Sequence, residues 1–176
     1  MKINAQTNII ETDRLILRHL SANDAPFILE LLNDPSFIKN IGDRGVRTIA
    51  DAEAYITKGP VASYKNNGFG LDLVALKETG ESIGMCGLIK RDTLEDVDIG
   101  YAFLPKFWSK GYGVESALAV LEYGLKVKKL KRIVAITLEA NKGSVHVLEK
   151  IGLKFEKMVK LEGDDEELML FAINTP

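Results

Sequence analysis

The chain has 176 residues, of which 46% are hydrophobic and 27% are charged, and its formal net charge is −2. These values favour one globular domain over residues 1–176 and exclude a general electrostatic attraction to nucleic acid or to an anionic membrane. No apolar run reaches the ~20 residues of a membrane span, no signal peptide opens the chain, and the single cysteine cannot form an internal disulfide, so we expect a cytoplasmic protein.

The first part of the chain predicts one strand and two helices. Apolar residues alternate over residues 12–20, which is the pattern of a strand. Ser21 is placed to cap a helix that ends before Pro35. Thr48 caps a second helix, which Pro60 interrupts or restarts.

The rest of the chain predicts a hairpin, a strand, a helix, a strand, a helix and two further strands. The hairpin is expected at residues 69–76 and 82–89, and the next strand at 97–104. A helix at 114–125, a strand at 133–138, a helix at 141–150 and two strands at 155–161 and 168–172 are expected to follow. This order predicts an α+β/α/β domain with a mixed, mostly antiparallel central sheet flanked by helices.

A strand, a glycine turn and a helix follow one another between residues 96 and 126. Pro105 ends the strand, because proline cannot donate a ladder hydrogen bond. The helix shows an apolar stripe of Val114, Ala117, Leu118, Leu121 and Leu125. Between them the chain bends at residues 109–113, where glycines let backbone N–H groups approach a ligand at the helix N-terminus. The stretch therefore predicts a phosphate-binding site.

Two common phosphate motifs do not fit this turn. A P-loop requires Gly-x-x-x-x-Gly-Lys-Ser/Thr, which the stretch does not contain. A dinucleotide fingerprint fits in part, but Ser116 replaces its third glycine, and Lys131 and Arg132 stand where it requires an acidic residue. A nucleotide-binding module is therefore the weaker interpretation.

The turn instead resembles the coenzyme A pyrophosphate loop of the GNAT acetyltransferases, Arg/Gln-x-x-Gly-x-Gly/Ala. Trp108 stands at the Arg/Gln position, as in the RimJ/RimL branch, which acetylates the N-termini of ribosomal proteins. Residues 15–18 with Asp24 and Ala25 resemble the opening motif of that branch, L-x-L-R…D-A. Residues 141–153 resemble its N-x-x-S-x-x-[LV]-L-E-K-x-G-F motif. The resemblance spans nearly the whole chain and implies a single GNAT-like domain that uses acetyl-CoA as co-substrate.

The resemblance also implies how acetyl-CoA is held. Backbone groups of Phe103 and Leu104 would meet the pantetheine arm, and Asn141 would hydrogen-bond its polar groups. The pyrophosphate would lie on the turn, which consists of Trp108, Ser109, Lys110, Gly111, Tyr112 and Gly113. In that turn Lys110 would add positive charge, or be a solvated lysine, and Trp108 would contact the cofactor or anchor the loop by packing.

Acetyl transfer from a thioester to an amine requires a neutral amine, aligned reactants and a donor for the developing charge. Asp98 is the first candidate base, directly or through a water, because Asp98-Ile99-Gly100-Tyr101 resembles the E-I-G-Y stretch that carries a catalytic glutamate in many relatives. Glu139, at the end of the next strand, is the second candidate. A structural role for either carboxylate stays open.

The usual acid of the family is missing from its position. Many relatives carry a tyrosine where this chain has Leu148, so Ser144, which matches the motif serine of the branch, is the candidate acid or sulfur-orienting donor. Its alternative role is to cap the first turn of the helix. No metal site is expected, since His19 and His146 have no acids at ligand spacing.

We interpret the chain as an acetyl-CoA-dependent N-acetyltransferase in which a primary amine attacks the thioester directly in a ternary complex. The acceptor would be a protein N-terminal Ala or Ser, at a site edged by residues 36–46 and by the hairpin around Gly163. One alternative is an acetyltransferase for a small-molecule amine, and another is a non-catalytic acyl-CoA sensor on the same fold. We expect no nucleic-acid or membrane partner, and a monomer or homodimer.

Overall fold

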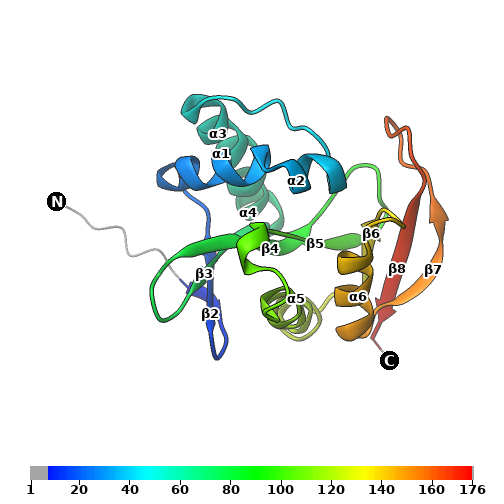
Figure 1. Ribbon diagram of the computed structural model, residues 1–176. Helices are drawn as coiled ribbons and strands as arrows, with labels where there is room; N and C mark the ends of the chain where they lie inside the picture. Colours follow the sequence, from blue (N-terminus) through cyan, green and yellow to red (C-terminus); the bar gives the residue numbers. More distant parts are fainter. Residues whose placement is uncertain (1–7, 176) are drawn as a thin grey trace.

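Eight strands form one sheet in the computed structural model, which describes residues 8–175 (Figure 1). Their order is β1-β2-β3-β4-β5-β6-β8-β7, and every neighbouring pair is antiparallel except β5 with β6. The strands are β1 (Asn8–Glu11), β2 (Leu15–His19), β3 (Leu71–Leu76), β4 (Ser82–Ile89), β5 (Val97–Phe103), β6 (Arg132–Thr137), β7 (Lys154–Val159) and β8 (Leu168–Asn174). The predicted mixed, mostly antiparallel sheet is thus confirmed.

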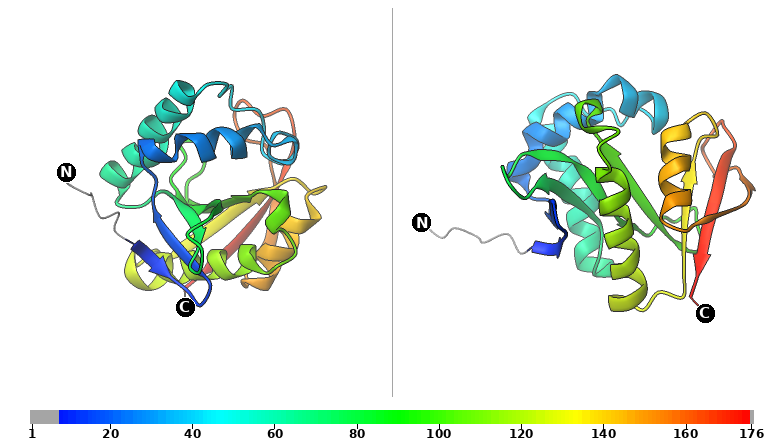
Figure 2. Two further views of the ribbon diagram at one scale, coloured as in Figure 1. Left: turned by 60° about the vertical axis from the view of Figure 1, so that its left-hand side comes forward. Right: turned by 60° about the horizontal axis from the view of Figure 1, so that its bottom comes forward.

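Helices cover both faces of this sheet (Figures 1 and 2). One face carries α1 (Ala25–Asn33), α2 (Pro35–Asn40), α3 (Ile49–Ile56) and α4 (Ala62–Asn67). The other carries α5 (Tyr112–Glu122) and α6 (Lys142–Lys150). Short helical turns η1 (Ala22–Asp24), η2 (Thr57–Val61), η3 (Pro105–Phe107) and η4 (Tyr123–Val127) adjoin them. The core lies between the sheet and these two helical layers.

Local signals place most of these elements where the sequence predicts them. Thr48 caps α3 and accepts a hydrogen bond from the Asp51 N–H (3.1 Å). Pro60 lies in a wide π-helical turn between α3 and α4, so the chain bends there without leaving the helical path. β1 is not predicted by the sequence, because four residues are too few to show a period.

The face that α5 turns to the sheet differs in part from the predicted stripe. Leu118, predicted to face the core, is 42% exposed, whereas Val120 is 1% exposed. The contact stripe passes through Gly124, where an added Cβ would lie 2.6 Å from Cδ1 of Ile133. The predicted stripe was wrong at Leu118, because that residue lies on the exposed side of α5. Gly124, in η4, packs close to the sheet, but a glycine adds nothing to a hydrophobic pattern.

The opening motif shared with the RimJ/RimL branch has a structural role here. Arg18, on β2, donates from both terminal nitrogens to the Asp24 carboxylate (2.9 and 2.8 Å). Asp24 is buried and lies at the end of η1, directly before α1. This forked ion pair joins the second strand to the start of the first helix.

The strands β5 and β6 separate shortly after they meet. Among the described residues they pair only at Val97 with Ile133 and at Asp98 with Val134. The N–H of Leu104 donates toward β4, to the Ile83 carbonyl (3.1 Å). Because backbone groups alternate along an antiparallel strand, those of residues 101 and 103 point to the other side, into the gap.

Candidate functional site

A cavity of about 1050 Å³ occupies the gap between β5 and β6. It extends from the N-terminus of α5 through the sheet, where β5 and β6 separate, to α2 and to the turn between β7 and β8. Both segments that the sequence places at the edge of the acceptor site contribute to its lining, through residues 36–42 with Arg44 and through Asp164, Asp165 and Glu166. The fold therefore brings the predicted cofactor turn and the predicted acceptor edge to one cavity.

The turn before α5 is shaped by two residues in the left-handed conformation. Ser109 has a φ of 59° and Gly111, the N-cap of α5, a φ of 82°. The first intrahelical bond runs from the Glu115 N–H to the Gly111 carbonyl (3.0 Å), so the N–H groups at residues 112–114 lie before it. These N–H groups and the helix dipole make this end of α5 suitable for an anion.

Trp108 anchors the turn to the strand before it. Its Nε1 donates to the Phe103 carbonyl (2.8 Å), while 47% of the residue is exposed. Trp108 thus anchors the turn through a hydrogen bond, whereas the sequence suggested packing, and it also lines the cavity. Gly113 faces α6, since an added Cβ would lie 3.4 Å from Cγ2 of Val147.

Arg14 is a part of this site that the sequence reasoning missed. It precedes β2 and donates from Nε to Glu115 (2.7 Å) and from Nη1 to the Lys110 carbonyl (2.9 Å). Its guanidinium carbon lies 4.5 Å from the ring centroid of Tyr112. Burial favours the neutral form of Glu115, but hydrogen bonds from Thr12 and Arg14 outweigh burial and lower its pKa. Arg14 therefore connects residues 109–111 to the first turn of α5, and its positive charge balances the negative charge of Glu115.

Asn141, Ser144 and Tyr101 form a polar group on the α6 side of the cavity. Asn141 caps α6 by accepting from the Ser144 N–H (3.1 Å), which leaves its side-chain NH₂ group as a donor. The Ser144 hydroxyl is not used for capping and lies 3.0 Å from the Tyr101 hydroxyl, which also donates to the Ser144 carbonyl (3.0 Å). All three residues line the cavity. Burial raises the pKa of Tyr101, so its hydroxyl stays protonated at neutral pH.

Asp98 lies on the opposite face of β5 from Tyr101, since three positions separate them. It lines the cavity but is 1% exposed. Arg91, which follows β4, donates from Nε to both carboxylate oxygens (3.0 and 3.1 Å). Burial raises the pKa of Asp98, although the charge and hydrogen bonds of Arg91 oppose this rise. Arg91 has no signal in the sequence that connects it to Asp98.

Several predicted residues lie outside the cavity lining. The N–H of Leu104 donates to Ile83 and its carbonyl accepts from Phe107 (2.9 Å), so its backbone groups are already engaged. Neither Leu104 nor Lys110 is among the residues that line the cavity, and Glu139, the second candidate base, is exposed away from it. Leu148 does line the cavity, and its side chain is buried.

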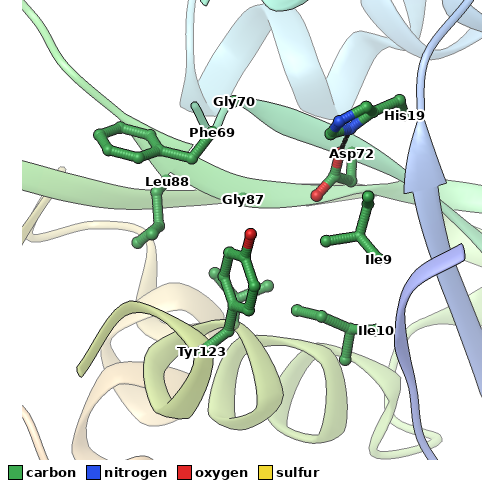
Figure 3. Close-up of a pocket in the computed structure, with 10 residues that line it drawn as sticks. Ile9, Ile10, His19, Phe69, Gly70, Asp72, Gly87, Leu88 and Tyr123 are labelled. Atoms are coloured by element: carbon green, nitrogen blue, oxygen red, sulfur yellow. Dashed lines mark hydrogen bonds and ion pairs between the residues drawn. The ribbon is translucent and has the colours of Figure 1, made fainter. Parts of the chain in front are cut away.

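A second and much smaller cavity lies between α5 and the sheet (Figure 3). Apolar residues and glycines form most of its wall, and Asp72 is hydrogen-bonded there to Nδ1 of His19 (2.8 Å). Its volume of about 10 Å³ has room for about one water molecule. It is too small for a substrate, so the large cavity is the candidate active site.

Within residues 8–175, no group of three or more His, Cys, Asp or Glu side chains is arranged to hold a metal ion. None of the helices in that part of the chain combines the length and the apolar character needed to cross a bilayer.

The comparison with known families decides the assignment. The profile of the acetyltransferase (GNAT) domain matches residues 14–154. The chain belongs to the GNAT acetyltransferase family. It is 33% identical to the uncharacterized N-acetyltransferase YnaD of Bacillus subtilis over 151 residues, which cover 86% of this chain and 85% of that protein. The protein is therefore an N-acetyltransferase.

Solved GNAT structures have the same fold. An acetyltransferase of the family from Bacillus anthracis is 30% identical, with a TM-score of 0.77 over 94% of this chain and 97% of the other. RimL, a ribosomal L7/L12 alpha-N-protein acetyltransferase solved in complex with coenzyme A, is 16% identical, with a TM-score of 0.82 over 96% of this chain and 98% of that chain. At this identity the second comparison concerns the fold alone.

Proposed function

We propose that the protein transfers the acetyl group of acetyl-CoA to the α-amino group of a protein whose N-terminal residue is Ala or Ser. The observation that carries this proposal is the separation of β5 and β6 beside the N-terminus of α5. One cavity of about 1050 Å³ joins these two features, and it has room for two substrates to meet in a ternary complex.

The chain's own groups fit acetyl-CoA in three places. The pyrophosphate would accept from the N–H groups at residues 112–114, where the helix dipole is positive. The amide groups of the pantetheine arm would pair with the backbone groups of Tyr101 and with the N–H of Phe103, which point into the gap, since the Phe103 carbonyl already accepts from Trp108. The Asn141 NH₂ group, which has no hydrogen-bond partner among residues 8–175, would donate to the same arm. Leu104 and Lys110 are not required in this arrangement.

Direct attack by the amine is favoured over an acyl-enzyme. Burial raises the pKa of the Cys86 thiol to about 12, and this residue is fully enclosed in the core. The Ser144 hydroxyl has another hydroxyl, that of Tyr101, as its side-chain partner, and this group does not act as a base at neutral pH. Neither residue is therefore an activated nucleophile.

Asp98 is proposed to accept the proton of the amine, through a water molecule. An α-amino group has a pKa of about 7.7–8.0, so a large fraction is already neutral near pH 7.5 and only a modest base is required. Burial raises the pKa of Asp98, which makes the ionised carboxylate a better base. Ser144 is proposed to donate to the sulfur as the thiolate leaves, with Tyr101 holding its hydroxyl in place.

The acceptor assignment rests on the edge of the cavity and on a similar fold. The mouth is bordered by residues 36–42 and by the β7–β8 turn, which are surface segments able to admit a flexible N-terminus. RimL, whose fold is similar, is an alpha-N-protein acetyltransferase by its description. A small-molecule amine is the second candidate, since the same mouth would admit one.

Thermal melting tests the cofactor, and turnover tests the reaction. Acetyl-CoA at 100 times its Kd should add about 2.7 kcal/mol of stability, whereas NAD and ATP at the same concentration should leave the melting temperature unchanged. Free thiol should then appear only when a peptide with N-terminal Ala or Ser is added, and an N-acetylated copy of that peptide serves as control. Binding without turnover on any amine would support the non-catalytic sensor instead.

A further inference from the structure

Two arginines line the acceptor side of the cavity from different parts of the chain. Arg44 belongs to the segment between α2 and α3, and Arg91 follows the end of β4. Arg44 is exposed and, within residues 8–175, no acidic side chain lies within ion-pair distance of it. Its charge is therefore not neutralised by a direct partner in the described part of the chain.

Arg91 is held in a way that leaves its donors available. Its Nε donates to both oxygens of the buried Asp98, while its side chain is 31% exposed. The two terminal nitrogens make no hydrogen bond with any residue that the structure describes. A guanidinium presents these outer N–H groups as a planar fork, which matches a carboxylate or a phosphate. Asp98 thus holds Arg91 through Nε, and the two terminal nitrogens stay available at the cavity wall.

Tyr55 lies in the cavity wall within range of the charges of both arginines. It lines the same cavity, and burial raises the pKa of its hydroxyl, while the charges of Arg44 and Arg91 both act on it in the opposite direction. Asp98 balances the charge of Arg91, so Arg44 supplies the net positive charge of this group, and Tyr55 adds a neutral hydroxyl donor. The other acids of the cavity lining, Asp164, Asp165 and Glu166, belong to the β7–β8 turn, and none forms an ion pair with either arginine.

We propose that Arg44, Arg91 and Tyr55 form an anion-binding subsite for the acceptor, so that the preferred acceptor is an amine that carries a carboxylate or phosphate a few bonds from its reacting nitrogen. This inference rests on the proposed function and narrows its substrate class. Binding the anion at the arginines orients the amine toward the thioester, and the acidic turn at the mouth favours the approach of the ammonium form. For a peptide acceptor, the anion would be an acidic side chain directly after the N-terminal residue.

The test measures binding of product analogues and so does not depend on finding the acceptor. The protein, saturated with coenzyme A, is titrated in a calorimeter with three matched pairs: N-acetylalanine against its amide, N-acetyl-Ala-Glu-amide against N-acetyl-Ala-Gln-amide, and N-acetylphosphoserine-amide against N-acetylserine-amide. The anionic member of at least one pair should bind about 10-fold more tightly, as expected for one charge-assisted contact. The pair that shows the difference identifies a free amino acid, an acidic peptide or a phosphorylated amine as the source.

Variants separate the subsite from general effects of charge. Arg44→Gln removes a side chain without an ion-pair partner in the described chain, so the fold should persist while the 10-fold difference falls to about 2-fold or less. Arg91→Lys keeps a charge beside Asp98 but loses the fork, and the difference should fall as well. Arg47→Gln is the matched control, because Arg47 lies in the same segment, pairs with Asp43 and does not line the cavity.

Equal affinities within all three pairs would overturn the proposed subsite. It would also be overturned if none of the six compounds bound measurably. A preference that survives both Arg44→Gln and Arg91→Lys would overturn it too. The melting shift with acetyl-CoA is measured on the same samples and reports on the cofactor site alone. A failure of the anion subsite is therefore distinguishable from a failure of the proposed function.

Discussion

The hydroxyl oxygens of Tyr101 and Ser144 lie 3.0 Å apart and join β5 to α6 inside the cavity. Tyr101 donates its single proton to the Ser144 carbonyl, so in the contact between the two hydroxyls Ser144 is the donor and the Tyr101 oxygen the acceptor. The sequence resemblance predicts that Leu148 stands where many family members carry a tyrosine acid. A phenol nevertheless reaches the cavity here, from a strand rather than from the helix.

We expect Ser144→Ala to lower kcat about 10²-fold, since it removes the proposed donor to the leaving sulfur. Tyr101→Phe should lower kcat by a similar or smaller factor, because it frees the serine hydroxyl to rotate away. Both variants should keep the melting shift produced by acetyl-CoA. The double variant should be no slower than Ser144→Ala, because the tyrosine acts through the serine.

Steady-state kinetics with a peptide acceptor and thermal melting with acetyl-CoA check this prediction. Full multiplication of the two single effects in the double variant would show that the hydroxyls act independently. An unchanged kcat in Ser144→Ala would leave the serine with a structural role only.

Asp98→Asn separates catalysis from stability. Burial raises the folded-state pKa of Asp98 above its unfolded value, so its contribution to stability is complete below about pH 3.9 and is lost as the pH rises through the folded pKa. At neutral pH the ionised form therefore opposes folding, and removing its charge should not lower the melting temperature. Loss of a general base should lower kcat/KM about 10²-fold.

The measurement is a pair of melting curves at pH 7 together with a pH profile of kcat/KM for both proteins. Glu139→Gln is the control, since Glu139 is exposed and outside the cavity lining. A variant at Asp98 that melts normally and keeps full activity would remove the base assignment and leave this carboxylate as the support of Arg91.

Arg14→Ala should weaken the binding of acetyl-CoA about 10-fold while kcat at saturation changes little. The side chain contacts Glu115, the Lys110 carbonyl and the Tyr112 ring, so its loss frees the turn and leaves a carboxylate uncompensated next to the proposed pyrophosphate position. Calorimetric titration with acetyl-CoA measures the effect. Arg14→Ala together with Glu115→Gln should recover part of the affinity, and no recovery would mean that the charge of Glu115 is irrelevant.

The Arg18–Asp24 pair should stabilise the fold in a pH-dependent way. Burial acts to raise the pKa of Asp24, but hydrogen bonds from Arg18 and Ser21 outweigh it, so the folded-state pKa is lowered. Its contribution is then present above the unfolded pKa of about 3.9 and is lost as the pH falls through the folded value. Asp24→Asn should cost about 1–3 kcal/mol at pH 7 and much less at about pH 2.

Urea unfolding at the two pH values measures this cost. Asp43→Asn is the control, because Asp43 pairs with Arg47 at the exposed surface, where such pairs contribute little. An equal loss for Asp24→Asn at both pH values would contradict an ionic contribution.

The local parts of the architecture followed from the amino-acid order alone. The alternation from Val97 to Phe103, the glycine turn before α5 and the cap at Thr48 each depend on neighbours within a few residues. Such patterns report backbone preferences and the need to bury apolar side chains, so most elements and the glycine turn before α5 were predictable. β1 and the exposed Leu118 were not, because one is too short to show a period and the other depends on which stripe of α5 meets the sheet.

The site's supporting contacts depend on distant parts of the chain. Arg14 reaches Glu115 across 101 residues, and Tyr101 reaches Ser144 across 43. Even Arg91 and Asp98, only 7 residues apart, meet because β4 and β5 pair in one particular register. The sequence by itself determined the elements, the turn and the family likeness, since these follow from local order. Only the tertiary structure decided which charges and hydroxyls meet in the cavity, because strand register and the separation of β5 from β6 set those distances.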